Sequence, residues 1–277
     1  MWTYAWRTDS GYGDGMPELP DVEGFREVLA RHGEGHRVER VKVADAGVLR
    51  GVSAARLRRE LRGRRLGTPT RRGKWLIAPT GGPTLLLHFG MTGRLVHCAE
   101  KDAPHPHDRV VIALRGDGQL RFRDQRKLQG IRLEDDAGVR RVLDSQGPDA
   151  LEVDRAGFDD LMRGRRARVK SVLIDQSALA GLGNLLADEI LWRARLHPAR
   201  RADTLGPDEL RRLYGRMRGV LRSAVPTGRV PPRRSWLTGH RADPDPHCPR
   251  CGHPLRRGRV AGRGTVWCPQ CQPEKGG

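Results

Sequence analysis

The chain has 277 residues, of which 37% are hydrophobic, and this is enough to bury one or two ordinary cores. Its formal net charge of +19 is spread along the whole length, which favours a polyanionic partner such as DNA or RNA. A membrane surface is the runner-up partner. However, the sequence has no long apolar run and no basic helix with an aromatic apolar face, so we expect no membrane association.

The first expected element is a short helix that follows a stretch without periodicity. Residues 1–15 show neither a helical nor a strand period, and no apolar signal-peptide core follows the start. We expect them to be an extension that is disordered or not translated. From Asp21, apolar residues recur at helical spacing and stop at Gly33, which predicts one amphipathic helix.

Strand-like segments then dominate as far as about residue 134. They are short, rich in apolar residues and separated in several places by glycine-rich turns. The expected strands cover residues 38–43, 75–78, 84–88, 94–97, 110–114 and 120–123. Together they predict an all-β unit with one leading helix, a β-sandwich domain over residues 16–145.

Beyond a linker at residues 146–149 the apolar period becomes helical. The last of these segments has Pro207 suited to its first turn and a continuous apolar stripe behind it. The expected helices cover residues 158–166, 169–176, 185–195 and 207–224. We predict a helical domain over residues 150–232, and the fold class is therefore α+β and multidomain.

Four cysteines near the end of the chain form two C-x2-C pairs separated by sixteen residues: Cys248, Cys251, Cys268 and Cys271. Two tight turns that each present two thiolates can complete a tetrahedral Zn²⁺ site. Disulfides fit poorly, because Cys98 would be left unpaired and no secretory segment is present. The residues between the pairs have the length of a β-hairpin and include four arginines. We predict a zinc ribbon over residues 240–272 that holds one structural zinc.

A glycine-rich turn at residues 178–184 separates two of the predicted helices. Gly181 and Gly183 precede a helix whose N-cap we assign to Asn184, and backbone N–H groups at such a position can point at a phosphate. The preceding helix carries Lys170, which we expect on its surface. Taken alone, the turn is more typical of a plain helix–helix connector. It indicates phosphate binding only together with its neighbours.

Five motifs follow one another in a specific order: Pro17-Glu18-Leu19-Pro20-Asp21-Val22-Glu23, Lys74 after Arg71-Arg72-Gly73, His88-Phe89-Gly90-Met91-Thr92-Gly93, Leu182-Gly183-Asn184 with Asp188-Glu189, and the ribbon. In this order they resemble the bacterial formamidopyrimidine-DNA glycosylase and endonuclease VIII family, over residues 16 to about 272. The resemblance implies a β-sandwich, a helix-two-turn-helix domain and a zinc ribbon. It also implies base excision repair on double-stranded DNA with damaged bases or abasic sites. We expect a monomer in the prokaryotic cytoplasm, associated with the nucleoid.

The resemblance further implies roles for individual residues. Pro17 is the nucleophile, whose secondary amine attacks C1′ and forms an iminium that permits β- and δ-elimination. Glu18 protonates the sugar ring oxygen and shuttles protons. Lys74 contacts a phosphate beside the lesion. The residues implied to bind DNA are Lys170, Asn184 and Arg263 on backbone phosphates, Met91, Arg126 and Leu128 in the hole left by the extruded nucleotide, and His107.

Three departures from the family pattern qualify the resemblance. With residues 1–16 before it, the nitrogen of Pro17 is an amide without a usable lone pair, unless translation starts at Met16 and that methionine is removed. Leu128 stands where formamidopyrimidine-type members usually have a phenylalanine wedge. The connector at residues 225–239 is shorter than the lesion-capping loop of enzymes that read 8-oxoguanine. We therefore expect weak selectivity for 8-oxoguanine and a preference closer to that of endonuclease VIII for oxidised pyrimidines.

Two other classes of protein remain open at this point. A catalytically silent DNA-damage binder would keep the ribbon, Lys170 and Asn184 without depending on Pro17. A zinc-ribbon transcription or RNA-binding factor would show no preference for lesions. Borohydride separates these classes, because only an iminium is reduced to a permanent protein–DNA link.

Overall fold

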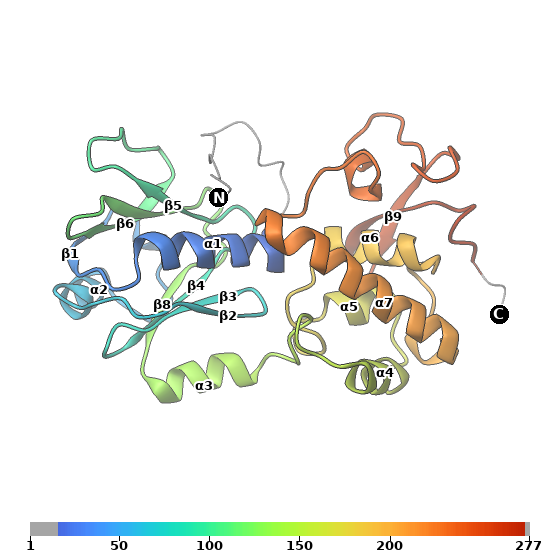
Figure 1. Ribbon diagram of the computed structural model, residues 1–277, viewed down its shortest axis with the longest axis horizontal. Coiled ribbons are helices and arrows are strands. Elements are labelled where there is room, and N and C mark those ends of the chain that lie inside the picture. Colours follow the sequence, from blue (N-terminus) through green and yellow to red (C-terminus); the bar gives the residue numbers. More distant parts are fainter. Residues whose placement is uncertain (1–15, 275–277) are drawn as a thin grey trace.

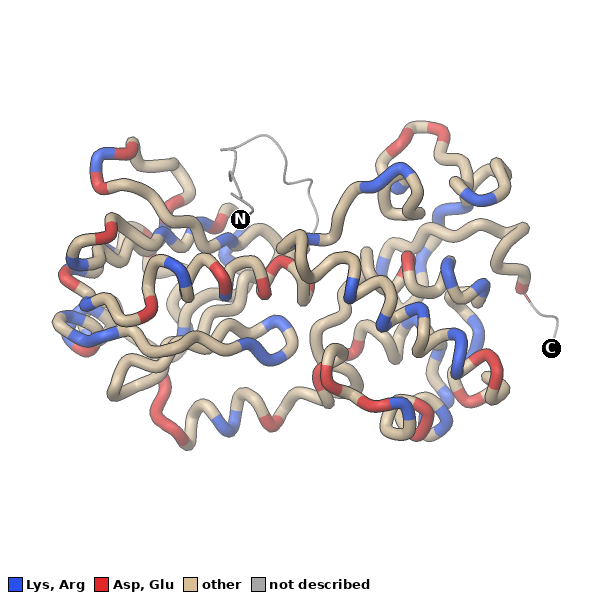
Figure 2. Tube along the Cα trace, in the orientation of Figure 1, with Lys and Arg blue, Asp and Glu red and all other residues tan. Residues whose placement is uncertain are grey.

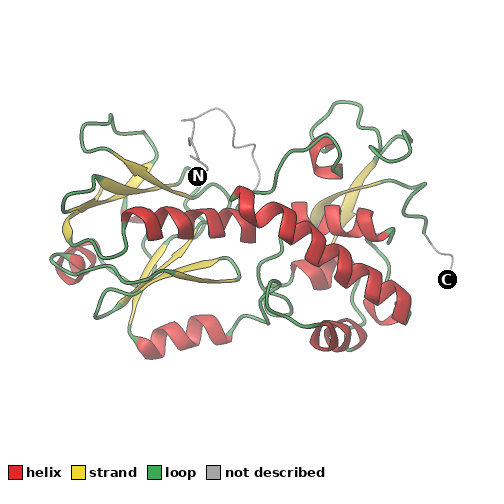
Figure 3. Ribbon diagram, viewed as in Figure 1, coloured by secondary structure: helices red, strands yellow, loops and turns green. Residues whose placement is uncertain are grey.

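The computed structural model describes residues 16–274, with most strands in one half and most helices in the other (Figures 1 and 3). The N-terminal half contains two four-stranded antiparallel sheets, ordered β1-β6-β7-β5 and β2-β3-β4-β8. Their bounds are β1 Val38–Val43, β2 Thr70–Arg72, β3 Trp75–Ala78, β4 Thr84–His88, β5 Arg94–Cys98, β6 Asp108–Leu114, β7 Gln119–Arg123 and β8 Ile131–Glu134. The predicted sandwich is confirmed.

Aromatic packing marks the centre of the sandwich. The ring of Phe89 lies 4.3 Å from that of Phe25 and 5.6 Å from that of Phe122, measured between centroids. All three side chains are buried in one apolar cluster, to which the sheets contribute residues such as Leu76 and Leu87. Burial of large apolar side chains like these is the main favourable contribution to folding, at roughly 1.5–3 kcal/mol for each side chain.

Two helices of this half were not predicted, α2 Ala54–Leu61 and α3 Asp136–Asp144. In α2 only Leu57 and Leu61 are buried, so its apolar stripe is a single i,i+4 pair among arginines. A stripe this narrow gives no clear helical period. The side chain of Ser53 caps the helix by accepting a hydrogen bond from the Arg56 N–H.

The C-terminal half is built from four helices and a two-stranded hairpin. Their bounds are α4 Arg155–Arg163, α5 Val169–Ile174, α6 Asn184–Ala194, α7 Pro207–Ala224, β9 Arg256–Val260 and β10 Arg263–Trp267. The four helices were predicted, although α4 begins three residues earlier than the expected start at Phe158. Asp154 explains the difference, because its side chain accepts a hydrogen bond from the Gly157 N–H and so caps the helix there.

Helix α1, Leu19–His32, belongs to both halves (Figure 1). Leu19 is part of the helical core, whereas Val22, Phe25 and Leu29 belong to the sandwich core. The helix begins before the predicted Asp21, because Pro20 fits its first turn and the Asp21 side chain accepts a hydrogen bond from the Glu18 N–H at 2.9 Å. The N-terminal end of α1 is therefore fixed at the junction of the two domains.

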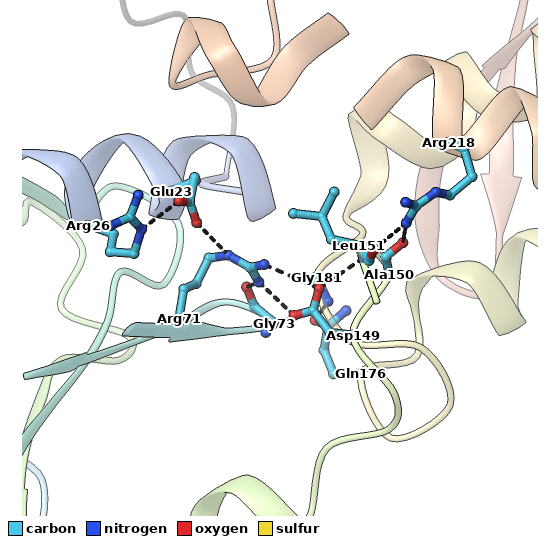
Figure 4. A network of polar contacts seen from close by, with 10 residues as sticks. All are labelled: Glu23, Arg26, Arg71, Gly73, Asp149, Ala150, Leu151, Gln176, Gly181 and Arg218. Atoms are coloured by element: carbon cyan, nitrogen blue, oxygen red, sulfur yellow. Dashed lines mark hydrogen bonds and ion pairs between the residues drawn. The ribbon is translucent and has the colours of Figure 1, made fainter. Parts of the chain in front are cut away.

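A buried ion-pair network joins the two domains beside α1 (Figure 4). The guanidinium of Arg71 lies 2.6 Å from a carboxylate oxygen of Asp149 and 3.0 Å from one of Glu23. Asp149 also accepts hydrogen bonds from the backbone N–H groups of Gly73 and Leu151. Asp149, predicted as part of a plain linker, is 3% exposed and instead holds the β2–β3 turn against the helical domain.

The distribution of charge and the hydropathy of the helices can be followed over the described residues. Lysine and arginine are distributed over both domains (Figure 2). Across residues 16–274, the helices are all too short or too polar to span a bilayer. The predicted extension, residues 1–15, lies outside the described part of the chain.

Candidate active site and nucleic-acid interface

The carboxylate of Glu18 sits on the N-terminus of α6. It accepts hydrogen bonds from the backbone N–H groups of Gly183 at 2.8 Å, Leu185 at 2.7 Å and Leu186 at 3.1 Å. A Cβ on Gly183 would lie 2.4 Å from the Glu18 carboxyl carbon, so only glycine permits this approach. The expectation that these N–H groups point at a DNA phosphate was wrong, because a carboxylate from the other domain occupies them.

Burial raises the pKa values of two neighbouring carboxyls, those of Glu18 and Asp21. Burial raises the pKa of Glu18, while the charge of Lys74 and the three N–H donors oppose the rise. Burial likewise raises the pKa of Asp21 to about 7, against the hydrogen bond from the Glu18 N–H. These shifts favour the neutral, protonated carboxyls, and a protonated carboxyl can act as a general acid.

Pro17 and Lys74 lie at the same junction. Pro17 is buried and directly precedes Glu18. Lys74 is 7% exposed and follows Gly73, where a Cβ would lie 2.9 Å from that of Ala180 in the α5–α6 turn. Burial lowers the pKa of Lys74, the charge of Glu18 opposes this, and the charge of Arg263 adds to it. Residues from the sandwich, the helical domain and the ribbon hairpin therefore share one electrostatic environment.

Lys170 does not lie on the surface as predicted. It is fully buried, and its Nζ lies 2.6 Å from Asp188 Oδ1 and donates to Thr265 Oγ1 at 2.8 Å and to the Gly264 carbonyl at 3.2 Å. The buried carboxylate compensates the charge of the ammonium group, and the ribbon hairpin covers it. Lys170 thus joins α5 to the zinc ribbon.

Asn184 is the first residue of α6, and Gly183 is the N-cap that the sequence analysis had assigned to Asn184. The Asn184 side chain instead donates its Nδ2–H to the carbonyl of Gly264 at 2.8 Å. Arg241 donates to the same carbonyl at 2.8 Å. Three side chains, counting Lys170, therefore fix the carbonyl next to Arg263. The Arg263 side chain itself is exposed.

Two loops of the sandwich carry the predicted void-filling residues, and a shared carboxylate connects them. Asp124, 1% exposed, accepts hydrogen bonds from the Thr92 hydroxyl at 2.5 Å and from the Arg126 N–H at 3.1 Å. The Arg126 N–H also donates to Thr92 Oγ1 at 3.0 Å. The loop of Met91 and the loop of Arg126 are therefore held in one arrangement.

Leu128 projects from the second of these loops. It is 49% exposed, and it is the only exposed large apolar side chain among residues 16–274. Lys127, just before it, has a left-handed φ of 54°, which costs energy for a residue with a side chain. The Lys127 carbonyl accepts from Arg50 at 2.7 Å and its Nζ pairs with Asp45 at 2.8 Å, so both ends of the residue are anchored.

His107 lies beside the same loop. It is half-buried, and its Nδ1 is 3.1 Å from a guanidinium nitrogen of Arg109. The Nε–H of Arg109 donates in turn to the Asp124 carbonyl at 2.7 Å. His107 thus belongs to the same group of residues as Met91 and Leu128.

The four predicted cysteines come together at the end of the chain. Their ligand atoms all lie within 4.8 Å of one another, with Sγ–Sγ distances of 3.9 Å for Cys248–Cys271, 3.6 Å for Cys251–Cys268 and 3.5 Å for Cys251–Cys271. Thiolates bound to one tetrahedral Zn²⁺ are about 3.8 Å apart, so this set fits one zinc ion. The indole N–H of Trp192 points at Cys248 Sγ from 3.3 Å. With all four positions filled by thiolates, the zinc is structural.

Several site residues were missed by the sequence analysis. Asp124, Asp149, Asp188 and Arg241 each position a predicted residue or segment without being predicted themselves. Asp188 stood inside one of the five motifs, and for this residue that was the available signal. Their roles depend on partners distant in sequence, such as Thr92 for Asp124 and Lys170 for Asp188.

Three family models match successive parts of the chain. The family model for the formamidopyrimidine-DNA glycosylase N-terminal domain matches residues 16–131. The model for its H2TH domain matches residues 146–232, and a zinc finger model found in FPG and IleRS matches residues 247–273.

Individual relatives agree with these matches. The formamidopyrimidine-DNA glycosylase of Pelotomaculum thermopropionicum is 35% identical over 94% of this chain and 100% of the relative. That of Symbiobacterium thermophilum is 37% identical over 93% and 90%. A crystal structure of the Lactococcus lactis enzyme bound to DNA containing an AP site superposes with a TM-score of 0.84, 28% identity, and coverage of 93% of this chain and 100% of that one. The chain belongs to the formamidopyrimidine-DNA glycosylase family.

Proposed function

We propose that the amine of Pro17 is the nucleophile with which this chain excises damaged bases and cleaves abasic sites. As a member of its family, the chain is a DNA glycosylase of base excision repair with lyase activity. The observation that carries the assignment of residues is the Glu18 carboxyl, which is buried next to Pro17, has a raised pKa and is held by α6.

The chemistry follows from these two neighbours. The Pro17 nitrogen forms a bond to C1′, and the damaged base leaves with the electrons of its glycosidic bond. The C1′–O4′ bond of the sugar ring then breaks as Glu18 gives a proton to the ring oxygen, while the nitrogen loses its proton and its lone pair forms the C1′=N bond. The resulting iminium draws electrons from the C2′–H bond, so a base can remove that proton. Elimination then breaks the phosphate ester bond first on one side of the sugar and then on the other. Because Glu18 is neutral when protonated and can lose that proton to form a carboxylate, it can move protons in several steps.

Attack by Pro17 requires a free secondary amine. We propose that the functional protein begins at Pro17, after removal of Met16. The family model begins its match at residue 16, which supports this start. An amide nitrogen at Pro17 has no available lone pair, so a chain with residues before it would bind DNA without forming the Schiff base.

Contacts to DNA follow from the same arrangement. We propose that Lys74, Asn184 and Arg263 bind phosphates near the lesion, and that Lys170 acts indirectly by holding the hairpin that presents Arg263. Met91, Arg126, Leu128 and His107 fill the space of the extruded nucleotide. Most of the affinity then comes from arginines that contact the DNA phosphate backbone, so the affinity falls steeply as the salt concentration rises.

The proposed substrate is double-stranded DNA with damaged bases or abasic sites. Solved relatives support this choice, since the Lactococcus lactis structures hold DNA with an AP site or with FAPY-dG. Because Leu128 replaces an aromatic wedge and the 225–239 connector is short, ring-saturated pyrimidines should be excised faster than 8-oxoguanine opposite cytosine. We further propose a monomer with its domains at residues 16–145, 150–232 and 240–272. We also propose that it acts on the DNA of the nucleoid in the cytoplasm.

Analysis of reaction products tests this function. Protein that begins at Pro17 is incubated with duplexes containing an abasic site, a ring-saturated pyrimidine or 8-oxoguanine, and both strand ends are identified. The expected product is a one-nucleotide gap flanked by two phosphates. Tight binding with intact strands would instead identify a silent damage binder. Release of the base without strand cleavage would contradict the lyase step.

A further inference from the structure

We propose a second metal site, formed by His32, His97 and Asp117 in the sandwich domain and separate from the zinc ribbon. His32 Nδ1 lies 3.1 Å from Asp117 Oδ2, and His97 Nε2 lies 3.6 Å from Asp117 Oδ1. One ligand atom from each residue falls within 4.8 Å of the other two. The site would take a divalent transition metal such as Ni²⁺ or Zn²⁺.

The donor set and its spacing suit such an ion. Two imidazoles and a carboxylate form a common set of three protein ligands that leaves positions for water. Ligands of one tetrahedral Zn²⁺ at about 2.0–2.1 Å are roughly 3.3–3.4 Å apart, and the two nitrogen–oxygen distances lie on either side of this value. Because a ring nitrogen binds a metal in the plane of its ring, the stacked imidazoles must turn out of their parallel arrangement to bring both nitrogens onto one ion.

The residues converge from three separate elements. His32 is the last residue of α1, His97 belongs to β5, and Asp117 lies in the β6–β7 turn between Gly116 and Gly118. The two imidazole rings are stacked, with centroids 3.8 Å apart and planes within 5°. This stacking brings a nitrogen of each ring to the same carboxylate. All three side chains are between 23% and 32% exposed, so an ion can reach them from solvent.

A bound metal would connect the end of α1 to the sheet. Without it, the carboxylate serves as an acceptor for His32, and the His97 ring nitrogen contacts the Asp117 carbonyl at 2.7 Å. Each of these hydrogen bonds joins only two of the residues, whereas a metal would bind all three at once. Because α1 carries Glu18 at its other end, the ion would stabilise the helix that positions the candidate active site.

Titration of Ni²⁺ into full-length, untagged protein with its ribbon zinc in place tests the site. Imidazole and carboxylate ligands suit Ni²⁺, while the filled thiolate site has no open position. Calorimetry should show one Ni²⁺ per chain without loss of zinc, together with a higher unfolding temperature. His97→Ala and, on a different element, His32→Gln should each lose this binding while retaining zinc.

His240→Ala is the matched control, because His240 also pairs with an aspartate, Asp243, at 3.0 Å, but in a pair with a single histidine. This variant should bind Ni²⁺ as the unmodified protein does. Absence of Ni²⁺ binding in the unmodified protein would overturn the proposal. Equal loss in the His97 and His240 variants would overturn it as well. Neither result depends on glycosylase activity.

Discussion

The zinc ribbon and the domain junction around Glu18 differ in how far apart in the sequence their residues lie. All four zinc ligands lie within residues 248–271, and two short turns present them. At the junction, the Glu18 carboxylate accepts a hydrogen bond from the backbone N–H of Gly183, which is 165 residues away in the sequence. Local spacing was therefore enough to predict the ribbon. At the junction, the partners that determine protonation and burial come from another domain.

Removal of zinc from the ribbon should have the largest effect, a loss of affinity for DNA. The hairpin that carries Arg263 depends on the metal, so chelation or Cys268→Ser should reduce affinity for an abasic-site duplex on the order of a hundredfold or more. Fluorescence anisotropy at fixed salt measures this. Cys98→Ser, which removes the cysteine outside the cluster, should bind normally. Normal binding by metal-free protein would show that the ribbon is not needed for the interface.

Glu18→Gln should be the next most severe change. Glutamine keeps the shape but cannot donate the proton, so base excision should slow by about 10²–10⁴-fold, the usual contribution of a general acid. Cleavage of a preformed abasic site should suffer much less, because no base has to be expelled. Single-turnover rates on the two substrates measure the difference. Glu27→Gln, an exposed change on the same helix, is the control. Equal losses on both substrates would argue for a structural role.

Thr92→Val tests whether the coupling of the two void-filling loops matters. Loss of the hydrogen bond to the buried Asp124 carboxylate should cost about 1.5–3 kcal/mol locally, and excision of a paired damaged base should fall roughly tenfold or more. Abasic-site cleavage should change little. Thr68→Val removes a similar threonine–carboxylate contact, to Glu34, outside the site. Matching losses in both variants would mean that the Thr92 contact has no specific role.

The raised pKa of Asp21 predicts a smaller effect, a dependence of folding stability on pH. Its pKa is about 7 in the folded protein against a usual 3.8, so between these values the folded state holds this proton and the unfolded chain does not. Its contribution to stability therefore declines as pH rises from about 4 to about 7 and then stays constant. Asp21→Asn should remove that part of the decline. Urea unfolding across this range measures it, and an unchanged slope would contradict the assigned pKa.

The sequence predicted the sandwich, the four main helices and the zinc ligands because each has a local pattern. It missed α2, whose buried face is reduced to Leu57 and Leu61. It also placed Lys170 on a surface, because a six-residue helix does not show which face a separate hairpin will cover. The same limit applies to Glu18. The family resemblance implied a catalytic role for Glu18, but its contacts with α6 depend on the packing of two domains.

Borohydride trapping on an abasic-site duplex tests the central claim most directly, using two mass-verified forms of the protein. The form that begins at Pro17 should become covalently attached to DNA, because its secondary amine forms a reducible iminium. The form that begins at Met1 should bind the same duplex without attachment. Equal trapping of both forms, or trapping of neither, would contradict the assignment of Pro17 as the nucleophile.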